Sequence, residues 1–154
     1  MASKTHTPQR VVIVGGGVAG LSIAVRLAQS GLPVTLLEAS KLGFASTTRN
    51  QGWLHSGDWF APCHSELARL WYRSLDQTLQ FCPGCLEPQT KPLAFVVSRP
   101  DTNVATWTRS WRETGIPFSE LEVEPFLSEL PGFERLAVQH AFELPDRAIR
   151  WHVL

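Results

Sequence analysis

The first part of the chain shows three successive patterns of hydrophobic positions. Residues 11–14 are four consecutive β-branched residues, which is typical of a strand buried on both faces in a parallel sheet. Apolar residues then recur at helical spacing from Val18 to Ala28, and Gly31 follows where a helix commonly ends. A second apolar run occupies residues 34–37. These patterns predict a strand, a helix and a second strand, which together form the βαβ unit of a parallel sheet.

The remainder of the chain alternates between helical and strand patterns. It predicts, in order, an amphipathic helix over 65–81, a strand over 93–98, a helix over 103–114, short helical turns over 117–133 and a strand over 136–142. A mixture of this kind after a βαβ unit indicates a second region of α+β character.

Three glycines follow the first predicted strand in the spacing G-x-G-x-x-G. Gly15 permits a tight turn out of the strand, Gly17 lets a pyrophosphate approach the backbone, and Gly20 lets the helix pack close to the sheet. The anion would then lie on the N–H groups of the helix N-terminus, at Val18 and Ala19. The spacing therefore predicts a site for the pyrophosphate of a dinucleotide.

An acidic residue ends the second predicted strand. Glu38 lies about twenty residues after the glycines, where a carboxylate accepts hydrogen bonds from the ribose hydroxyls of an adenosine and repels a 2′-phosphate. Glu38 and the neighbouring Ala39 are therefore assigned to cofactor binding. Because FAD and NAD present the same adenosine diphosphate, the fingerprint alone is consistent with both.

Composition and charge limit the class of partner. The chain has 154 residues and is 44% hydrophobic, which is typical of a globular protein. Its 14 Lys and Arg residues balance its 14 Asp and Glu residues, so it shows no footprint for nucleic acid or an anionic membrane. Residues 1–9 are polar and are expected to form a flexible leader, and the longest apolar region is too interrupted for a membrane span. A small molecule is the expected partner.

The stretch after the second predicted strand is long and polar. Residues 41–60 are rich in Gly, Ser, Thr and Asn, and long loops inside compact domains are usually functional. They contain the run STTRNQG at 46–52, followed by LHSG at 54–57. Together with the glycine fingerprint, these residues resemble the FAD-dependent oxidoreductases of the D-amino-acid oxidase superfamily, and among them the L-2-hydroxyglutarate and glycerol-3-phosphate dehydrogenase branches. The resemblance is distinctive over residues 10–81 and looser beyond them.

The resemblance implies FAD as the cofactor and a role for each position in this loop. Hydroxyl side chains would bind the pyrophosphate and ribityl chain, the next residues would bring backbone toward the isoalloxazine, and the histidine would lie near the flavin. These groups are, in the same order, Ser46, Thr47 and Thr48; Asn50, Gln51 and Gly52; and His55. In some relatives a histidine in this region is attached covalently to the flavin, and the sequence is consistent with either form.

His55 and Arg49 each have a chemical and a structural interpretation. Since the unperturbed pKa of histidine lies near neutral pH, His55 could take a proton from a substrate or stabilise charge on reduced flavin, or it could only brace the loop. Arg49 could pair with the pyrophosphate, with a substrate carboxylate or with a structural acid.

Cys82 and Cys85 form the motif C-P-G-C, which invites a redox or zinc interpretation. The other nearby ligands, Cys63 and His64, lie at the opposite end of the predicted helix, on the order of 25 Å away, so one zinc ion could not gather all four. The motif also ends a helix, whereas a reactive C-x-x-C needs its first thiol at a helix N-terminus. Ordinary thiols in a reducing compartment, and hence a cytoplasmic location, are expected.

We therefore predict an α/β architecture in which a Rossmann-type FAD-binding βαβ unit is followed by part of an α+β substrate domain. Residues 10–85 are assigned to the FAD-binding domain and 86–154 to the substrate domain. The predicted function is the N-terminal portion of a flavin-dependent oxidoreductase that takes a hydride from a C–H bond next to an amine or hydroxyl.

The resemblance implies that the remaining strands of such an enzyme follow its substrate domain, so the chain alone is expected to be inactive and to require the missing C-terminal half. Two alternatives stay open at this point. One is an NAD-binding dehydrogenase domain, and the other is a non-catalytic remnant that retains an adenosine-binding fold.

Overall fold

The computed structural model describes residues 10–44, 46–88, 94–97, 103–128, 138–150 and 153. The leader predicted over residues 1–9 lies outside the described residues. So do residues 136 and 137 of the strand predicted over 136–142, but the later part of that prediction is confirmed by a strand at His140–Glu143. The chain divides into two compact units, Met1–Gly52 with Trp151–Leu154, and Trp53–Arg150. The domain boundary predicted after residue 85 concerns a complete enzyme, and it stays a prediction.

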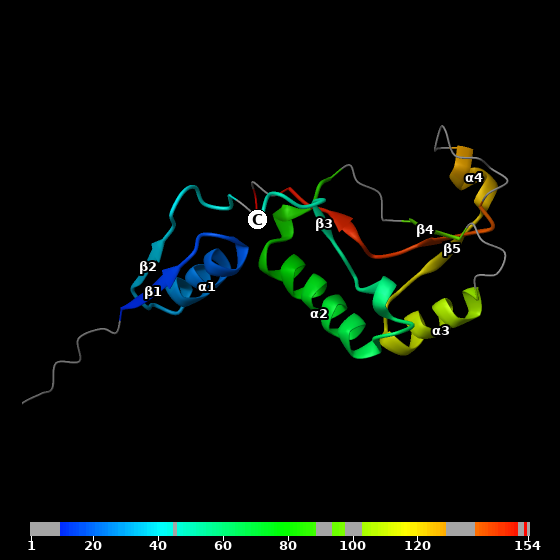
Figure 1. Ribbon diagram of the computed structural model, residues 1–154, viewed down its shortest axis with the longest axis horizontal. Coiled ribbons are helices and arrows are strands. Elements are labelled where there is room, and N and C mark those ends of the chain that lie inside the picture. The colour runs from blue at the N-terminus through cyan, green and yellow to red at the C-terminus, as the bar shows by residue number, and fades with distance from the viewer. Residues whose placement is uncertain are drawn as a thin grey trace, which may run out of the picture. The chain divides into compact units, whose positions relative to one another are not determined.

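The first unit contains the predicted βαβ arrangement. It consists of β1 (Val11–Val14), α1 (Val18–Gln29) and β2 (Val34–Leu37), which can be followed in Figure 1. The two strands are paired in parallel, with Val11 opposite Val34 and Val14 opposite Leu37. The predicted Rossmann-type unit is therefore confirmed, and each element begins and ends within a few residues of its prediction.

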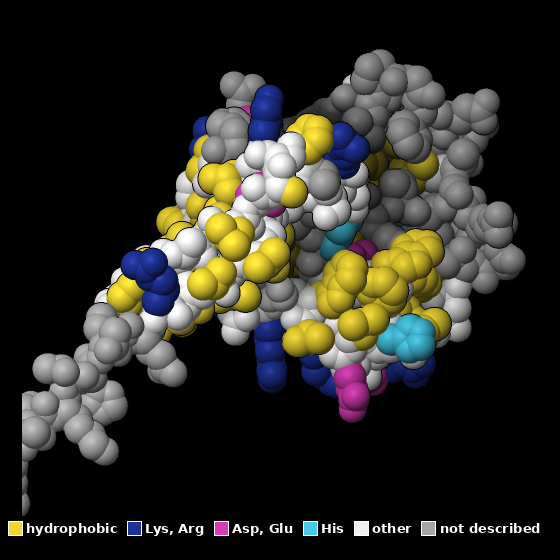
Figure 2. All heavy atoms as spheres, turned by 60° about the vertical axis from the view of Figure 1, so that its left-hand side comes forward, with side chains coloured by type: hydrophobic (Ala, Val, Ile, Leu, Met, Phe, Trp, Pro, Cys, Tyr) yellow, Lys and Arg dark blue, Asp and Glu magenta, His cyan; other side chains and the backbone are white. Residues whose placement is uncertain are grey.

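The prediction that the first strand is buried on both faces is wrong for this chain. Along β1, half-buried and exposed residues alternate, and Val14 is 83% exposed. Ile13 lies on the side of α1, since its Cγ2 is 3.5 Å from the position of a Cβ built at Gly20. Among the described residues, α1 covers one face of the two-stranded sheet, and none of its own residues is buried. Hydrophobic side chains therefore remain at the surface of this unit, where Figure 2 shows them.

The second unit combines two antiparallel sheets with helices. Its elements are β3 (Trp53–Leu54), the 3-10 turn η1 (Asp58–Phe60), α2 (Ser65–Phe81), the 3-10 turn η2 (Pro83–Cys85), β4 (Ala94–Val97), α3 (Val104–Thr114), β5 (Ser119–Leu121), α4 (Val123–Ser128), β6 (His140–Glu143) and β7 (Arg147–Ala148). β3 pairs with β7, and β6 lies between β4 and β5.

Both predicted amphipathic helices are confirmed. α2 has the predicted bounds, and α3 begins after Asn103, whose side chain accepts a hydrogen bond from the N–H of Thr106 at 3.1 Å. Gly115 ends α3 in the left-handed conformation, with φ +77°. Residues 119–121 form the strand β5 where helical turns were predicted, because they pair with β6 across the sheet and local propensity did not reveal that partner. No helix among the described residues combines the length and the hydropathy needed to cross a bilayer.

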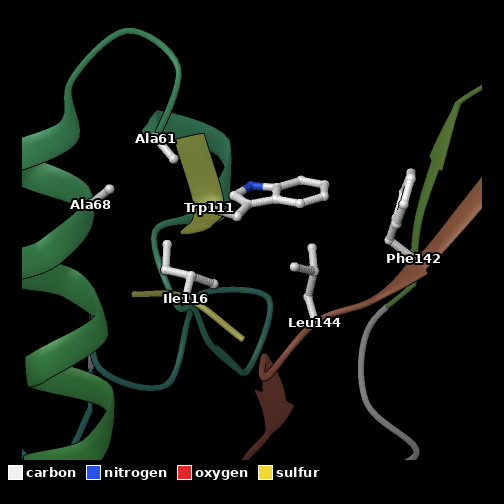
Figure 3. Close-up of a cluster of buried hydrophobic side chains, with 6 residues drawn as sticks. All are labelled: Ala61, Ala68, Trp111, Ile116, Phe142 and Leu144. Atoms are coloured by element: carbon white, nitrogen blue, oxygen red, sulfur yellow. The ribbon is translucent and has the colours of Figure 1, made fainter. Parts of the chain in front are cut away.

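Trp111 lies at the centre of the core of the second unit. Its side chain is fully buried, and Figure 3 shows the indole between the side of α2, where Ala68 lies, and the strand that carries Phe142. The Trp111 and Phe142 rings meet edge to face with centroids 5.4 Å apart, a geometry that aromatic pairs prefer. The other buried members of the cluster are Ala61, Ile116 and Leu144. This core packs η1, α2, α3 and β6 together and so holds the segments on either side of residues 55–58 in place.

Candidate functional site

The glycine turn after β1 has a backbone path that only small residues permit. Gly15 has φ +107°, which is strained for other residues, and its N–H donates to the carbonyl of Leu37 at 2.8 Å. A Cβ at Gly20 would lie 1.9 Å from the carbonyl oxygen of Gly15. The backbone conformation of the turn therefore requires the first glycine, and the close packing of the turn against α1 requires the third, before any ligand is considered.

The N-terminus of α1 presents backbone donors without a side-chain cap. The N-cap is Gly17, it provides no side-chain hydrogen bond, and the first turn contains no acidic residue. The N–H of Val18 donates to Oγ1 of Thr47 at 3.1 Å, and Thr47 lies 29 positions later in the chain. A Cβ at Gly17 would lie 3.1 Å from the same hydroxyl oxygen. The structure thus places the hydroxyl of Thr47 at the positive end of the helix, where an anion is favoured.

Glu38 is tied to the same turn. Its Oε2 accepts a hydrogen bond from the N–H of Gly16 at 2.6 Å, and its Oε1 accepts one from the N–H of Ser40 at 2.9 Å. These bonds, that from Gly16 above all, lower the pKa of the Glu38 carboxyl below its ordinary value. The carboxylate is therefore ionised at neutral pH and held at the carboxyl end of β2. Each of its oxygens can accept a further hydrogen bond, which is what the predicted role toward a ribose requires.

The loop after β2 is organised by the side chain of Asn50. Its Nδ2 donates to the carbonyl oxygens of Ser46 and Thr47 at 3.0 and 3.1 Å, and its Oδ1 accepts from the N–H of Gly52 at 2.9 Å. Asn50 therefore holds the backbone that carries Thr47.

Arg49 has a contact that the sequence did not predict. Its guanidinium lies 4.5 Å from the centroid of the Phe44 ring, which is a cation–π contact. The predicted pairing of Arg49 with a pyrophosphate, a substrate carboxylate or a structural acid stays a prediction. The cofactor roles assigned to Ser46, Thr48, Gln51 and Ala39 stay predictions.

His55 lies in the second unit and has an acidic partner. Its Nδ1 is 2.8 Å from Oδ1 of Asp146, a residue 91 positions later in the chain. No role was assigned to Asp146 from the sequence. No local signal could have found it, because the two residues meet through the pairing of β3 with β7.

A hydroxyl and a second carboxylate extend the pair. Oδ2 of Asp146 accepts from the N–H of Ser56 at 3.1 Å and from its Oγ at 2.5 Å. Oγ of Ser56 also lies 3.4 Å from Oδ1 of Asp58, and all three of these residues are buried. Burial first, and then the charge of Asp146, raise the pKa of the Asp58 carboxyl to about 6. The indole N–H of Trp111 donates to the carbonyl of Asp58 at 3.1 Å and so anchors this acidic segment to the core.

The C-P-G-C motif has the character of structural thiols. Among the described residues, none of the three cysteines forms a disulfide, and Cys85 is fully buried. Burial above all raises the pKa of the Cys85 thiol, which makes it a poorer nucleophile. Across the part of the chain that the structure describes, no group of His, Cys, Asp and Glu side chains is arranged to hold a metal ion.

Comparison with known proteins gives a consistent family assignment. The sequence profile of FAD dependent oxidoreductases matches residues 10–152. The chain is 30% identical over 148 residues to the anaerobic glycerol-3-phosphate dehydrogenase subunit A1 of Haloferax volcanii, a match that covers 90% of this chain and 24% of the relative.

Solved structures share the fold. L-α-glycerophosphate oxidase from Mycoplasma pneumoniae, dithionite-reduced and with FAD bound, has a TM-score of 0.70 at 21% identity, over 94% of this chain and 40% of that one. Glycine oxidase from Geobacillus kaustophilus has a TM-score of 0.61 at 25% identity, over 91% of this chain and 40% of that one. The chain thus spans 24% of the haloarchaeal relative and 40% of each of these solved chains.

Proposed function

Because the chain belongs to the family of FAD-dependent oxidoreductases, we propose that its first unit binds the adenosine diphosphate part of FAD and that its second unit carries a proton-transferring group of the same enzyme. The observation that supports the proposal most is the meeting of three separate segments at one end of β1 and β2. The glycine turn, the carboxylate of Glu38 and the hydroxyl of Thr47 are joined there by hydrogen bonds. Family membership favours FAD over the NAD alternative.

The first unit fits a dinucleotide for physical reasons. A pyrophosphate needs backbone donors, a favourable dipole and room for close approach, and the uncapped start of α1 at Gly17 offers all three. On this proposal the N–H of Ala19 and the hydroxyl of Thr47, which accepts a hydrogen bond from the N–H of Val18, face the phosphates. The ionised carboxylate of Glu38 accepts hydrogen bonds from the ribose hydroxyls, and its charge disfavours a 2′-phosphate.

The second unit contributes chemistry through His55. Bound FAD would supply the hydride acceptor. His55 would take the proton that a substrate hydroxyl or amine loses when the adjacent C–H bond gives up its hydride, since an imidazole works as a base near neutral pH. The relatives named above are, by their names, enzymes of glycerol phosphate or glycine. We propose a small hydroxy or amino compound as the substrate class of the enzyme to which these residues contribute.

Cofactor binding by the full-length protein tests the first part of the proposal. Thr47→Val keeps the shape of the side chain and removes the hydroxyl, so it is expected to weaken FAD binding by about tenfold, the size of one hydrogen bond. Thr78→Val is the matched control, because the hydroxyl of Thr78 donates only to the carbonyl of Ser74 within α2. Titration calorimetry of the apoprotein with FAD, and separately with NAD, measures both effects.

Each outcome has a definite meaning. Equal FAD affinity in the Thr47→Val variant and the parent would remove Thr47 from the phosphate site. Saturable binding of NAD without FAD would favour the dehydrogenase alternative. A protein that binds FAD but never reduces it with any hydroxy or amino compound would favour the non-catalytic alternative.

A further inference from the structure

The register of β3 and β7 brings His55 to Asp146. Trp53 pairs with Ala148 and Leu54 with Arg147, so the next position along this antiparallel register sets His55 opposite Asp146. The hydrogen bond of 2.8 Å between Nδ1 and Oδ1 is therefore a product of the strand pairing. A shift of one residue would turn one of the two side chains to the opposite face and break it.

The carboxylate of Asp146 has a fixed orientation. Its side chain is fully buried, whereas that of His55 is 32% exposed. Oδ2 accepts from the backbone N–H of Ser56, and a backbone N–H can only donate. Oδ1 is consequently the oxygen turned to the imidazole. The guanidinium of Arg147 donates to the carbonyls of Leu144 and Asp146 rather than to this carboxylate.

A second histidine–carboxylate pair in the same unit shows what a simple surface contact looks like. Nδ1 of His140 lies 3.0 Å from Oε1 of Glu120, but these side chains are 40% and 61% exposed. Such exposed pairs contribute little to structure or reactivity. The His55 pair differs from it in having a buried carboxylate held by separate donors.

We infer that Asp146 is the positioning residue of His55: it accepts the Nδ1 proton, and the imidazole therefore carries its basic lone pair on Nε2. This inference rests on the proposed role of His55 as the proton acceptor. During oxidation, the substrate O–H or N–H bond would break and its proton would form a bond to Nε2, and the electrons of that bond would form the new C=O or C=N bond. FAD, when bound, would supply the acceptor for the hydride that leaves the adjacent C–H bond. The imidazolium that results is stabilised by the hydrogen bond to the carboxylate of Asp146.

Among the described residues, charged groups near His55 come from η1 and from the residues around the start of β7. Asp146 faces it from just before β7 and Asp58 from η1, and the guanidinium of Arg147 donates to the backbone carbonyl of Asp146. An imidazolium formed between two acidic groups is balanced by them, which is what a base needs in a partly buried position.

The tautomer of His55 provides a test that does not depend on turnover. In the full chain labelled with ¹⁵N-histidine, long-range ¹H–¹⁵N spectra report which ring nitrogen carries the proton, and a His55→Gln variant assigns the signal. For the neutral ring we expect the proton on Nδ1. A proton on Nε2 in the parent protein would overturn the inference, and this measurement remains decisive if a variant fails to fold.

Asp146→Asn is expected to invert the tautomer. The amide oxygen must take the place of Oδ2, because the N–H of Ser56 donates there. The amide NH₂ then faces Nδ1 and donates to it, so the ring proton moves to Nε2. An unchanged tautomer in this variant would show that Asp146 does not determine the protonation of His55.

Kinetics of the holoenzyme show whether Asp146 positions His55 for proton transfer or is only a structural contact. With a substrate of the proposed class, Asp146→Asn should lower the rate of flavin reduction by about a hundredfold or more while FAD affinity and KM change little. Glu120→Gln removes the carboxylate of the exposed pair and is expected to leave the rate unchanged. A loss of thermal stability with an unchanged rate in the Asp146→Asn variant would reduce the pair to a structural contact.

The failure of this inference is distinguishable from the failure of the proposed function. Suppose that His55→Gln keeps the rate of flavin reduction, while the parent and Asp146→Asn show the expected tautomers of His55. The proposed role of His55 as proton acceptor is then wrong, and the pair has no catalytic role. If His55→Gln loses the rate and the parent carries its proton on Nε2, the role of His55 stands and the positioning by Asp146 is refuted.

Discussion

The substitution Asp58→Asn is expected to make the protein more stable at neutral pH. Asp58 is buried next to Ser56 and close to the carboxylate of Asp146, and its pKa is raised from 3.8 to about 6 by burial and by that neighbouring charge. At neutral pH the group is therefore ionised in a place that disfavours the charge. Asparagine has the same shape, is neutral at every pH and can still accept a hydrogen bond from the backbone.

The size and sign of the effect follow from the two pKa values. A rise from 3.8 to about 6, at about 1.4 kcal/mol for each pKa unit, means that the ionised group costs the native state roughly 3 kcal/mol relative to the unfolded chain. That cost is complete above the folded pKa, shrinks as the pH falls through 6, and vanishes below 3.8, where both states are protonated. Since the amide also gives up a charge-assisted bond from the N–H of Trp59, we expect a gain of about 1–3 kcal/mol in the free energy of unfolding at pH 7.5.

Urea unfolding followed by tryptophan fluorescence measures this difference. Trp111, which is buried and bonded to the carbonyl of Asp58, reports on the unit concerned. Between pH 7.5 and pH 4.5 the advantage of the variant should fall by roughly 2 kcal/mol. Asp76→Asn is the control, because Asp76 is exposed on α2 with its carboxylate bonded only to the side chain of Gln80 in the contacts observed. It should change the free energy of unfolding by less than about 0.5 kcal/mol at both pH values.

Two results would refute this reasoning. A variant that is less stable than the parent at pH 7.5 would show that the contacts of the Asp58 carboxylate outweigh its desolvation. A gain of the same size at both pH values would show that the effect does not come from ionisation.

Three further predictions concern other parts of the chain. Gly20→Ala would place a Cβ 1.9 Å from the carbonyl oxygen of Gly15, so the full-length variant should purify with little flavin, and a full flavin absorbance would contradict the role given to this turn. Trp111→Phe removes the indole hydrogen bond to the carbonyl of Asp58 and leaves a small cavity; it should cost about 1–3 kcal/mol in urea unfolding, and an unchanged midpoint would place the core elsewhere. In hydrogen exchange of the 154-residue chain, amides of α1 should exchange faster than those of α3, because α1 has no buried residue whereas α3 carries Trp111; equal protection would show that the first unit is as stable as the second.

Local patterns were sufficient for the βαβ unit and for the two long helices. The β-branched run, the helical stripe and the glycines that bound them predicted β1, α1 and β2, and the stripes over 65–81 and 103–114 predicted α2 and α3. Each of these elements forms because neighbouring residues repeat a spacing that matches its geometry. The two-residue strands β3 and β7 have no such repeat and were not predicted, and β5 was predicted as helical turns because its pairing partner lies about twenty residues away.

Exposure could not be derived from pattern alone. The residues of β1 resemble those of a strand covered on both faces, but the described structure covers one face, and Val14 lies 83% exposed. A hydrophobic residue shows that burial would be favourable. It does not show which surface provides the cover.

The candidate site likewise contains features that could be predicted from contiguous residues and contacts that could not. The sequence by itself determined the glycine turn, the acid at the end of β2 and the choice of His55 as a candidate residue, because a tight turn, a strand end and a histidine motif are properties of contiguous residues. Only the tertiary structure decided that Thr47 meets the N-terminus of α1, that Asp146 holds the imidazole and that Asp58 is buried beside them. These contacts join positions 29 and 91 residues apart. Strand register and the packing around Trp111 bring them together, and neither is encoded in the spacing of neighbouring residues.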